Sequence, residues 1–285
     1  MIYKHNGSII TDISGKWLTS GGTPVDPYNP LNLPPNTVRV RTSDGNVPKK
    51  YEGAYGARYD SATLVPGTSD VYDVFKSGTD FTRLLYRSEN VIEVLGANTS
   101  GVTSMGTMFC ECSSLQSVPL FNTTNVTATA WMFDGCRSLS TVPLFDTSNV
   151  TNMAGMFRNC TSLSTVPLFD TFKVTITASM FEGCTLLQSV PLYDTSSVTD
   201  IGFMFSGCTS LTNIPLFDTS NVGYMSYMFM DCTSVQSGAL ALYQQASTQA
   251  NPPSRHDSTF YNCGSNTVTG AAELSQIPSD WKSRP

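Results

Sequence analysis

The chain has 285 residues and a net charge of −6. This acidity argues against a nucleic-acid backbone as a partner, since phosphate binding needs clustered positive charge. Charged residues make up only 13% of the chain, so its polar surface consists mainly of hydroxyl and amide groups, which is more typical of a β-rich repeat array than of a helical enzyme. The segment Asn98–Ser237 has nine acidic and three basic residues and so carries the whole net charge.

The beginning of the chain gives no sign of export or membrane insertion. Residues Met1–Gly7 lack the apolar core of a secretory signal, and no run of 18 apolar residues follows anywhere. We therefore expect no membrane insertion. Because the chain begins with Met, retention in the cell until lysis is a simpler expectation than removal of a signal.

The first 80 residues differ from the rest and are expected to form two small segments. Residues 1–35 are rich in Gly and Pro near their end and predict an attachment segment and linker. Residues 36–80 predict a small β-rich region, because Thr37–Arg41 alternates in polarity and Asp44–Asn46 has the composition of a hairpin turn. Ile9, Ile10 and Trp17 suggest a further short β element.

A 24-residue repeat dominates the remainder of the chain. Met-Phe pairs begin at Met108, Met132, Met156, Met180, Met204 and Met228. Cysteines recur at the same step, at Cys112, Cys136, Cys160, Cys184, Cys208 and Cys232. A unit of this length cannot bury its own apolar face, so successive copies must stack into a solenoid.

Each unit predicts a strand, a turn and a short helix. Leu139, Val142 and Leu144 give the spacing of a short strand pointing inward, and Asp146–Asn149 has the composition of a turn. After the turn, apolar residues from Val150 to Phe157 recur about every three positions, which favours a helical turn. The expected fold class is therefore an α/β repeat: a leucine-rich-repeat solenoid with a parallel β-sheet on one face.

Both ends of the array depart from the repeat in the way that capping coils do. Thr82–Asn98 aligns with the repeat as a degenerate first coil, and Phe260–Cys263 follows its counterpart by 31 residues instead of 24. The extra residues around Gly238–Gln245 predict a helix. We therefore expect the solenoid to span residues 81–237 and a C-terminal helix and capping coil to span residues 238–285.

The repeat resembles the BspA-like leucine-rich repeats of bacterial surface proteins, in the variant of mycoplasma-type lipoproteins and lactic-acid-bacterial adhesins. The pattern M-F-x-x-C-x-S at Met156–Ser162 and F-D-T-S-N-V-T-x-M at Phe145–Met153 carry this resemblance, which extends from about Leu84 to Cys263. Flanking stretches such as Leu33–Arg39 and Ile277–Trp281 are similar to those of gut-bacterial and bacteriophage proteins. The resemblance implies adhesion or receptor binding and supplies no catalytic residue.

Two polar columns of the repeat have structural explanations. The cysteines are expected to be buried free thiols, with a disulfide or a metal site as less favoured alternatives, because no C-x-x-C motif exists and both histidines lie outside the array. Asp146, Asp170, Asp194 and Asp218 follow the predicted strand and are expected to cap turns instead of binding calcium.

A column of aromatic and proline residues is the candidate binding surface. It comprises Phe121, Phe145, Phe169, Tyr193 and Phe217, with Pro143, Pro167 and Pro191 beside them. If Leu120 and its equivalents point inward, strand alternation places the aromatic rings outside. An exposed apolar stripe of this length marks an interaction site. The alternative, that the rings stack on one another and seal the sheet, stays open.

No catalytic motif accompanies the repeat. His256, Asp257 and Ser258 are the residue types of a hydrolase triad, but adjacency in one loop does not make a relay. We expect a non-enzymatic protein with no metal or cofactor, most simply a phage tail-fibre, head-fibre or decoration protein that binds a host-surface protein or glycan.

Other virion subunits would then bind its N-terminal region, and its location would be the virion surface after assembly in the host cytoplasm. A bacterial cell-surface adhesin and a purely structural virion subunit are the alternatives, and a homo-oligomer is compatible with each.

Overall fold

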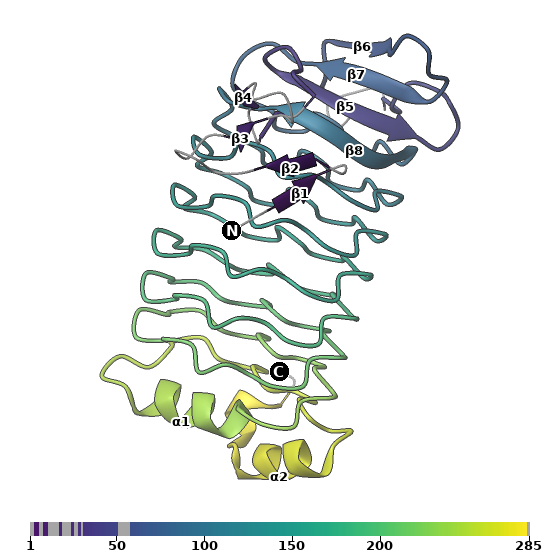
Figure 1. The fold of residues 1–285 in the computed structure, drawn as a ribbon. Helices are drawn as coiled ribbons and strands as arrows, with labels where there is room; N and C mark the ends of the chain where they lie inside the picture. The colour runs from purple at the N-terminus through teal and green to yellow at the C-terminus, as the bar shows by residue number, and fades with distance from the viewer. Residues whose placement is uncertain are drawn as a thin grey trace.

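The chain folds as a stack of coils closed at one end by a small sheet and at the other by helices (Figure 1). The computed structural model describes residues 3–5, 8–10, 17–18, 24–25, 28–29, 31–50 and 58–283. About half of the expected attachment segment therefore lies outside the described residues. Its described parts include two antiparallel ribbons, β1 (Tyr3–His5) with β2 (Ser8–Ile10) and β3 (Trp17–Leu18) with β4 (Pro24–Val25).

The N-terminal end of the stack is covered by an antiparallel sheet in the order β6-β7-β5-β8. Its strands are β5 (Thr37–Thr42), β6 (Ser61–Leu64), β7 (Val71–Phe75) and β8 (Val91–Asn98). The strand expected from Thr37–Arg41 is confirmed, but it pairs with the distant β7 and β8 and not in a local hairpin. β8 also belongs to the degenerate first coil, whose Val94 amide donates to the Ser117 carbonyl at 3.2 Å. The sheet thus caps an edge that would otherwise be free to pair with another chain.

One side of each coil is extended with an inward residue at every third position. In one coil Leu139 and Phe145 are buried and Val142 is half-buried, while Leu144 is exposed. Pro143 has no amide hydrogen to donate to a sheet, and its carbonyl accepts from the Phe145 amide at 3.0 Å, which closes a three-residue turn. A threefold repeat of this kind is that of polyproline II and not of a pleated strand. The strand expected here is therefore wrong.

The Met-Phe side of each coil holds most of the backbone hydrogen bonds that join coil to coil. The amides of Gly155, Phe157 and Asn159 donate to carbonyls of the next coil at 2.8, 2.9 and 2.7 Å. Successive i→i+3 turns connect them, as where the Cys160 amide donates to the Phe157 carbonyl at 3.1 Å. The short helix expected here is wrong, because consecutive turns give the same three-residue spacing of apolar side chains as a helix.

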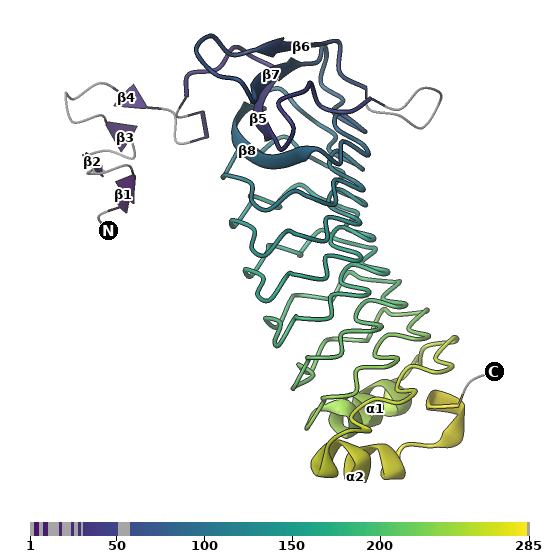
Figure 2. The same cartoon turned by 90° about the vertical axis from the view of Figure 1, so that its right-hand side faces the viewer.

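Two positions per coil adopt the left-handed backbone conformation that these turns need. Gly155 has φ +59° and Asn159 has φ +56° in one coil. The equivalents of Asn159 include Gly135, Gly183 and Gly207, which are residues that tolerate positive φ. The coils lie closer together along one edge than along the other, so the stack bends (Figure 2).

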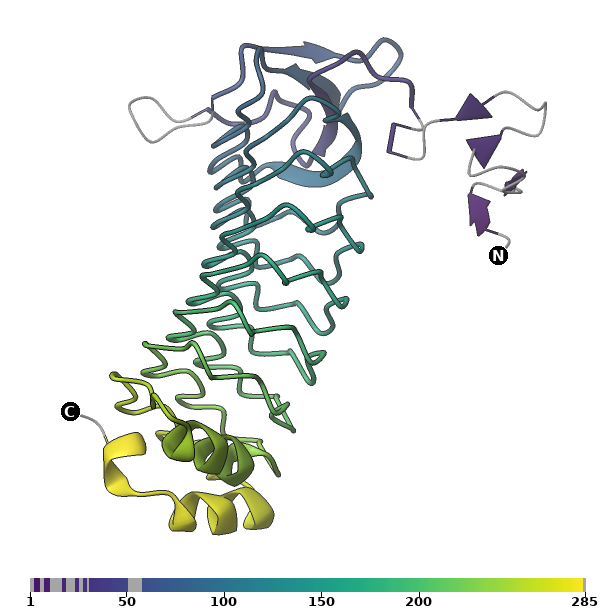
Figure 3. The ribbon, with the colours of Figure 1, turned by 90° about the vertical axis from the view of Figure 1, so that its left-hand side faces the viewer.

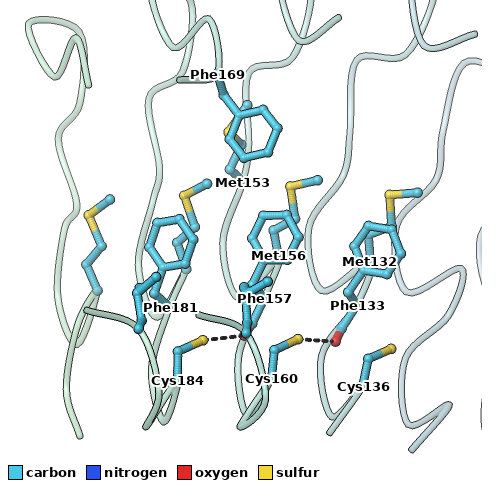
Figure 4. Close-up of a cluster of buried hydrophobic side chains, with 14 of the residues drawn as sticks. Met132, Phe133, Cys136, Met153, Met156, Phe157, Cys160, Phe169, Phe181 and Cys184 are labelled. Atoms are coloured by element: carbon cyan, nitrogen blue, oxygen red, sulfur yellow. Dashed lines mark hydrogen bonds between the residues drawn. The ribbon is translucent and has the colours of Figure 1, made fainter. Parts of the chain in front are cut away.

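The core consists of side-chain columns that run along the stack (Figure 4). The Phe157 ring lies 5.6 Å from that of Phe133 and 5.7 Å from that of Phe181, with interplanar angles of 4° and 5°. Met153 and Met156 are buried beside them. Each buried aromatic or methionine side chain contributes about 1.5–3 kcal/mol of hydrophobic stabilisation, so the stack is held mainly by these columns.

The C-terminal end is closed by α1 (Ala239–Thr248), α2 (Val268–Gln276) and the 3-10 helix η1 (Ser279–Trp281), which lie together beneath the last coils (Figure 3). The helix expected near Gly238 is confirmed as α1, which buries Leu242 and Ala246. The stacked rings of the Met-Phe pairs, from Phe109 to Phe229, form the phenylalanine column, and Phe260 continues it at 6.0 Å from Phe229. The buried Trp281 ring covers Phe260 at 6.3 Å and ends the column. Within the described residues, no helix is long and apolar enough to span a membrane.

Candidate binding surface

The aromatic column predicted as an exposed stripe is buried. Phe121, Phe145, Phe169, Tyr193 and Phe217 are each at most 3% exposed, and Pro143, Pro167 and Pro191 are half-buried. The rings pack against the phenylalanine column, as where Phe169 lies 5.9 Å from Phe157. The expected exposure was wrong because the segment has a threefold period, which turns the larger aromatic side chain inward and the leucine before it outward. The alternative of stacked rings that seal the coil is the one observed.

The outward position is instead occupied by a column of leucines. Leu144, Leu168, Leu192 and Leu216 are 58%, 59%, 60% and 53% exposed. They occupy the same position in four consecutive coils and follow the prolines directly. We call this surface the leucine ladder. Four large apolar side chains exposed in register form a contiguous patch, and such patches mark interaction sites more often than isolated leucines do.

The backbone of the leucine ladder has unused hydrogen-bonding groups. Within the described residues, the amides of Leu144, Leu168, Leu192 and Leu216 have no hydrogen-bond partner. This follows from the prolines, because a segment without a sheet ladder leaves its peptide groups to solvent. The surface therefore offers N–H donors beside its apolar side chains.

A shallow hollow lies at the N-terminal end of the leucine ladder. Tyr28, from the segment before the stack, lines it together with Leu120, Leu144 and Leu168. Asp146 and Asp170 line it as well. The molecule thus already places one of its own aromatic residues beside three leucines of this face.

The aspartate column borders the leucine ladder and caps turns, as predicted. The Asp194 carboxylate accepts hydrogen bonds from the Ser196 amide at 2.9 Å and the Ser196 hydroxyl at 2.6 Å. These bonds lower the pKa of Asp194, which keeps it ionised. Asp170, Asp194 and Asp218 are exposed, so a row of negative charge runs two residues beyond the leucines.

The cysteine column is buried, as predicted, and its thiols are free. Each thiol of the six cysteines that recur at the 24-residue step donates to a carbonyl of the preceding coil, as where Cys160 Sγ lies 3.1 Å from the Phe133 oxygen (Figure 4). Burial raises the pKa of Cys184 to about 12, so this thiol stays protonated. Among the described residues, no group of three His, Cys, Asp or Glu side chains is placed to hold a metal ion.

The three residue types of a hydrolase triad are separated by their hydrogen bonds. His256 Nδ1 lies 3.0 Å from the Pro253 carbonyl, and its Nε2 lies 3.4 Å from Asp280. Asp257 instead accepts from Ser226 at 2.8 Å, and the Ser258 hydroxyl donates to the Ser283 carbonyl at 2.6 Å. The structure therefore joins none of the three to another in a relay.

The repeat region matches a known protein family. A family model described as "Mycoplasma protein of unknown function, DUF285" matches residues 70–188 and 164–263, which together cover more than half of the chain. The chain belongs to this family. The match supports the resemblance to BspA-like repeats that the Met-Phe and cysteine columns indicate. No curated protein matches the chain.

Two solved leucine-rich-repeat structures are similar to this chain at low identity. One is a leucine-rich repeat protein from Eubacterium ventriosum, with 22% identity and a TM-score of 0.40, over 57% of this chain and 39% of that one. The other is the T. pallidum leucine rich repeat protein, with 16% identity and a TM-score of 0.39, over 80% and 96%. This chain thus spans less than half of the Eubacterium protein.

Proposed function

We propose that the protein is a non-enzymatic binding protein whose leucine ladder contacts a protein on a bacterial surface. The observation that carries this proposal is the exposure of Leu144, Leu168, Leu192 and Leu216 in one register. The fold does not require these leucines to be large, because the buried aromatic residue that follows each of them already fills the coil.

The chemistry of the surface identifies the class of partner. Apolar side chains, free amides and a row of aspartates lie side by side, so a complementary segment presents apolar side chains, carbonyl oxygens and Lys or Arg. Burying the exposed part of each leucine contributes about 1 kcal/mol, so four of them account for roughly a thousandfold in affinity. A basic, apolar protein segment fits this surface better than a glycan or an acidic partner does.

The biological setting that we propose is the surface of a phage or prophage virion, with the N-terminal segment attached to other virion subunits. The resemblance of the flanking sequences to bacteriophage proteins supports this setting. A bacterial cell-surface adhesin is the second candidate, favoured by the membership of the mycoplasma protein family. Tail or capsid genes beside this gene and the protein in purified particles would favour the virion. Its recovery from the envelope of uninfected cells would favour the adhesin.

Binding to intact cells of the source bacterium, or of the host where the gene is phage-borne, tests the role of the leucine ladder. We expect Leu144→Ser with Leu192→Ser to weaken binding of the purified protein at least about tenfold. Leu186→Ser is the matched control, because Leu186 is 52% exposed but lies outside the leucine ladder. Equal binding by the double variant and the control would show that the leucine ladder is not the contact surface.

A further inference from the structure

A second group of aromatic residues lies about half a coil away from the leucine ladder, at strained backbone positions. Trp131, Phe203 and Tyr227 occupy the first left-handed position of their coils, with φ of +60°, +57° and +63°. A bulky side chain in this conformation is an outlier that the surroundings must enforce. Gly155 occupies the same position in another coil, so the turn itself needs no aromatic residue.

Three aromatic rings form one patch near the C-terminal end of the stack. The rings of Phe203 and Tyr227 are 4.6 Å apart with an interplanar angle of 17°. Tyr224 lies over Gly202, where an added Cβ atom would come within 2.0 Å of the ring. All three aromatic side chains are only partly buried, so they belong to the surface and not to the core columns.

Charged and polar groups surround this patch. The Arg255 guanidinium lies over the Tyr224 ring at 4.8 Å from its centre. Asp257 accepts from the Ser226 hydroxyl at 2.8 Å. Asp200 accepts from the Gly202 amide at 3.0 Å, beside the position that Tyr224 covers. Both signs of charge are present, which sets the patch apart from the acidic border of the leucine ladder.

We propose that this aromatic patch, formed by Phe203, Tyr224 and Tyr227, is a second binding site and takes a pyranose sugar of a neutral polysaccharide. A pyranose has an apolar face of C–H bonds and a rim of hydroxyl groups. The Phe203 and Tyr227 rings fit the apolar face, while the Arg255 guanidinium over Tyr224 and the carboxylates of Asp200 and Asp257 hydrogen-bond paired hydroxyls.

The other ligand classes that use aromatic surfaces fit this patch less well. The Arg255 guanidinium lies over the Tyr224 ring, so a ligand cation placed on that ring would meet a like charge. The carboxylates of Asp200 and Asp257 repel phosphate, which disfavours single-stranded nucleic acid. A surface patch, in contrast to a deep pocket, suits one ring of a long polymer.

Substitutions that the left-handed backbone tolerates test the proposal without breaking the turn. Phe203→Gly and Tyr227→Asn replace strained residues by types that accept positive φ, so both variants should melt within a few degrees of the unmodified protein. Trp131→Gly is the matched control, because it removes an aromatic residue from the same column four coils from Tyr227.

The probes are the methyl β-glycosides of glucose, galactose and N-acetylglucosamine, with binding followed by saturation-transfer NMR. We expect transfer from at least one glycoside at about 10 mM, and at least about tenfold weaker binding by Phe203→Gly and Tyr227→Asn but not by Trp131→Gly. The site is independent of the leucine ladder, so Leu144→Ser with Leu192→Ser should leave this signal unchanged.

Three results would overturn the proposal. No transfer from any of the three glycosides would show that the aromatic patch takes no such sugar. Unchanged binding by both patch variants would place the sugar elsewhere. A melting temperature of Phe203→Gly far below that of the unmodified protein would show that the rings are packing residues which hold the last coils together.

Discussion

Neighbouring residues of one coil should respond in opposite ways to truncation, which tests the threefold period of the extended segment. Phe169 is 2% exposed, whereas Leu168 is 59% exposed. Phe169→Ala removes a ring that lies 5.9 Å from Phe157 and 6.5 Å from Tyr193 and leaves a cavity, so it should lower the free energy of unfolding by about 3–5 kcal/mol. Leu168→Ala removes atoms that already contact water and should cost less than about 1 kcal/mol.

Thermal and urea unfolding followed by circular dichroism measure both effects. For a domain of this size, a loss of 1 kcal/mol lowers the melting temperature by about 2–4 °C, so Phe169→Ala should melt about 6–20 °C below the unmodified protein. Leu168→Ala should melt within about 4 °C of it. If Leu168→Ala destabilises the protein as much as Phe169→Ala, the leucine is a core residue and the assignment of the outward column is wrong.

Three further predictions concern the thiols, the glycines and the aspartates. Because burial raises the pKa of Cys184 to about 12 and all the cysteines are buried, a thiol reagent at pH 8 should label the protein only after denaturant is added; rapid labelling of the folded chain would refute this. Gly238→Ala should strongly lower the melting temperature, because Gly238 has φ +100° and an added Cβ atom would lie 2.3 Å from the Ile214 carbonyl oxygen. Gly207→Asn should melt near the unmodified protein, because an added Cβ atom at Gly207 would come no closer than 3.6 Å to another residue and Asn tolerates positive φ. Hydrogen bonds from Ser196 lower the pKa of Asp194. The ionised Asp194 should therefore stabilise the folded protein at any pH above the ordinary pKa of an aspartate, and this contribution should disappear as the pH falls through the lowered pKa. An NMR titration that found the ordinary pKa for the Asp194 carboxyl would contradict this.

The features that the sequence predicted correctly are those that any stacked repeat must share. A strict step of 24 residues requires equivalent residues to lie in columns. Small or flexible apolar side chains in such columns, as at Cys160 and Met156, belong to the core. The sequence also predicted the turn at Asp194, because an aspartate two residues before a serine commonly forms this turn.

The features that the sequence did not predict depend on backbone geometry that several patterns share. The sequence Val142–Phe145 is compatible with a strand, in which every second side chain points inward, or with an extended segment in which every third one does. Only the proline favours the threefold pattern, because it removes a donor that a sheet would need. In the same way, apolar residues every third position from Val150 to Phe157 fit a helix or a series of turns. The left-handed aromatic residues, such as Phe203, have no sequence signal, since their conformation is imposed by the neighbouring coils.

The α2 helix was also not predicted. Its sequence Val268–Gln276 contains Gly270 and β-branched residues at its start, which are poor helix formers. The Thr267 hydroxyl accepts from the Gly270 amide at 3.0 Å and caps the first turn. Gly270 is required because an added Cβ atom would lie 2.1 Å from the Val235 carbonyl oxygen. Packing against the last coil therefore overrides the weak local preference.

Cysteine labelling of the folded protein tests most directly that the leucines of the extended segments, and not the aromatic residues that follow them, point outward. The native thiols are buried, so a reagent such as dithionitrobenzoate reports on a single introduced cysteine. We expect Leu168→Cys to react within seconds, as an exposed thiol does, and Tyr193→Cys to react only after unfolding. Rapid reaction at Tyr193→Cys with protection at Leu168→Cys would contradict the account.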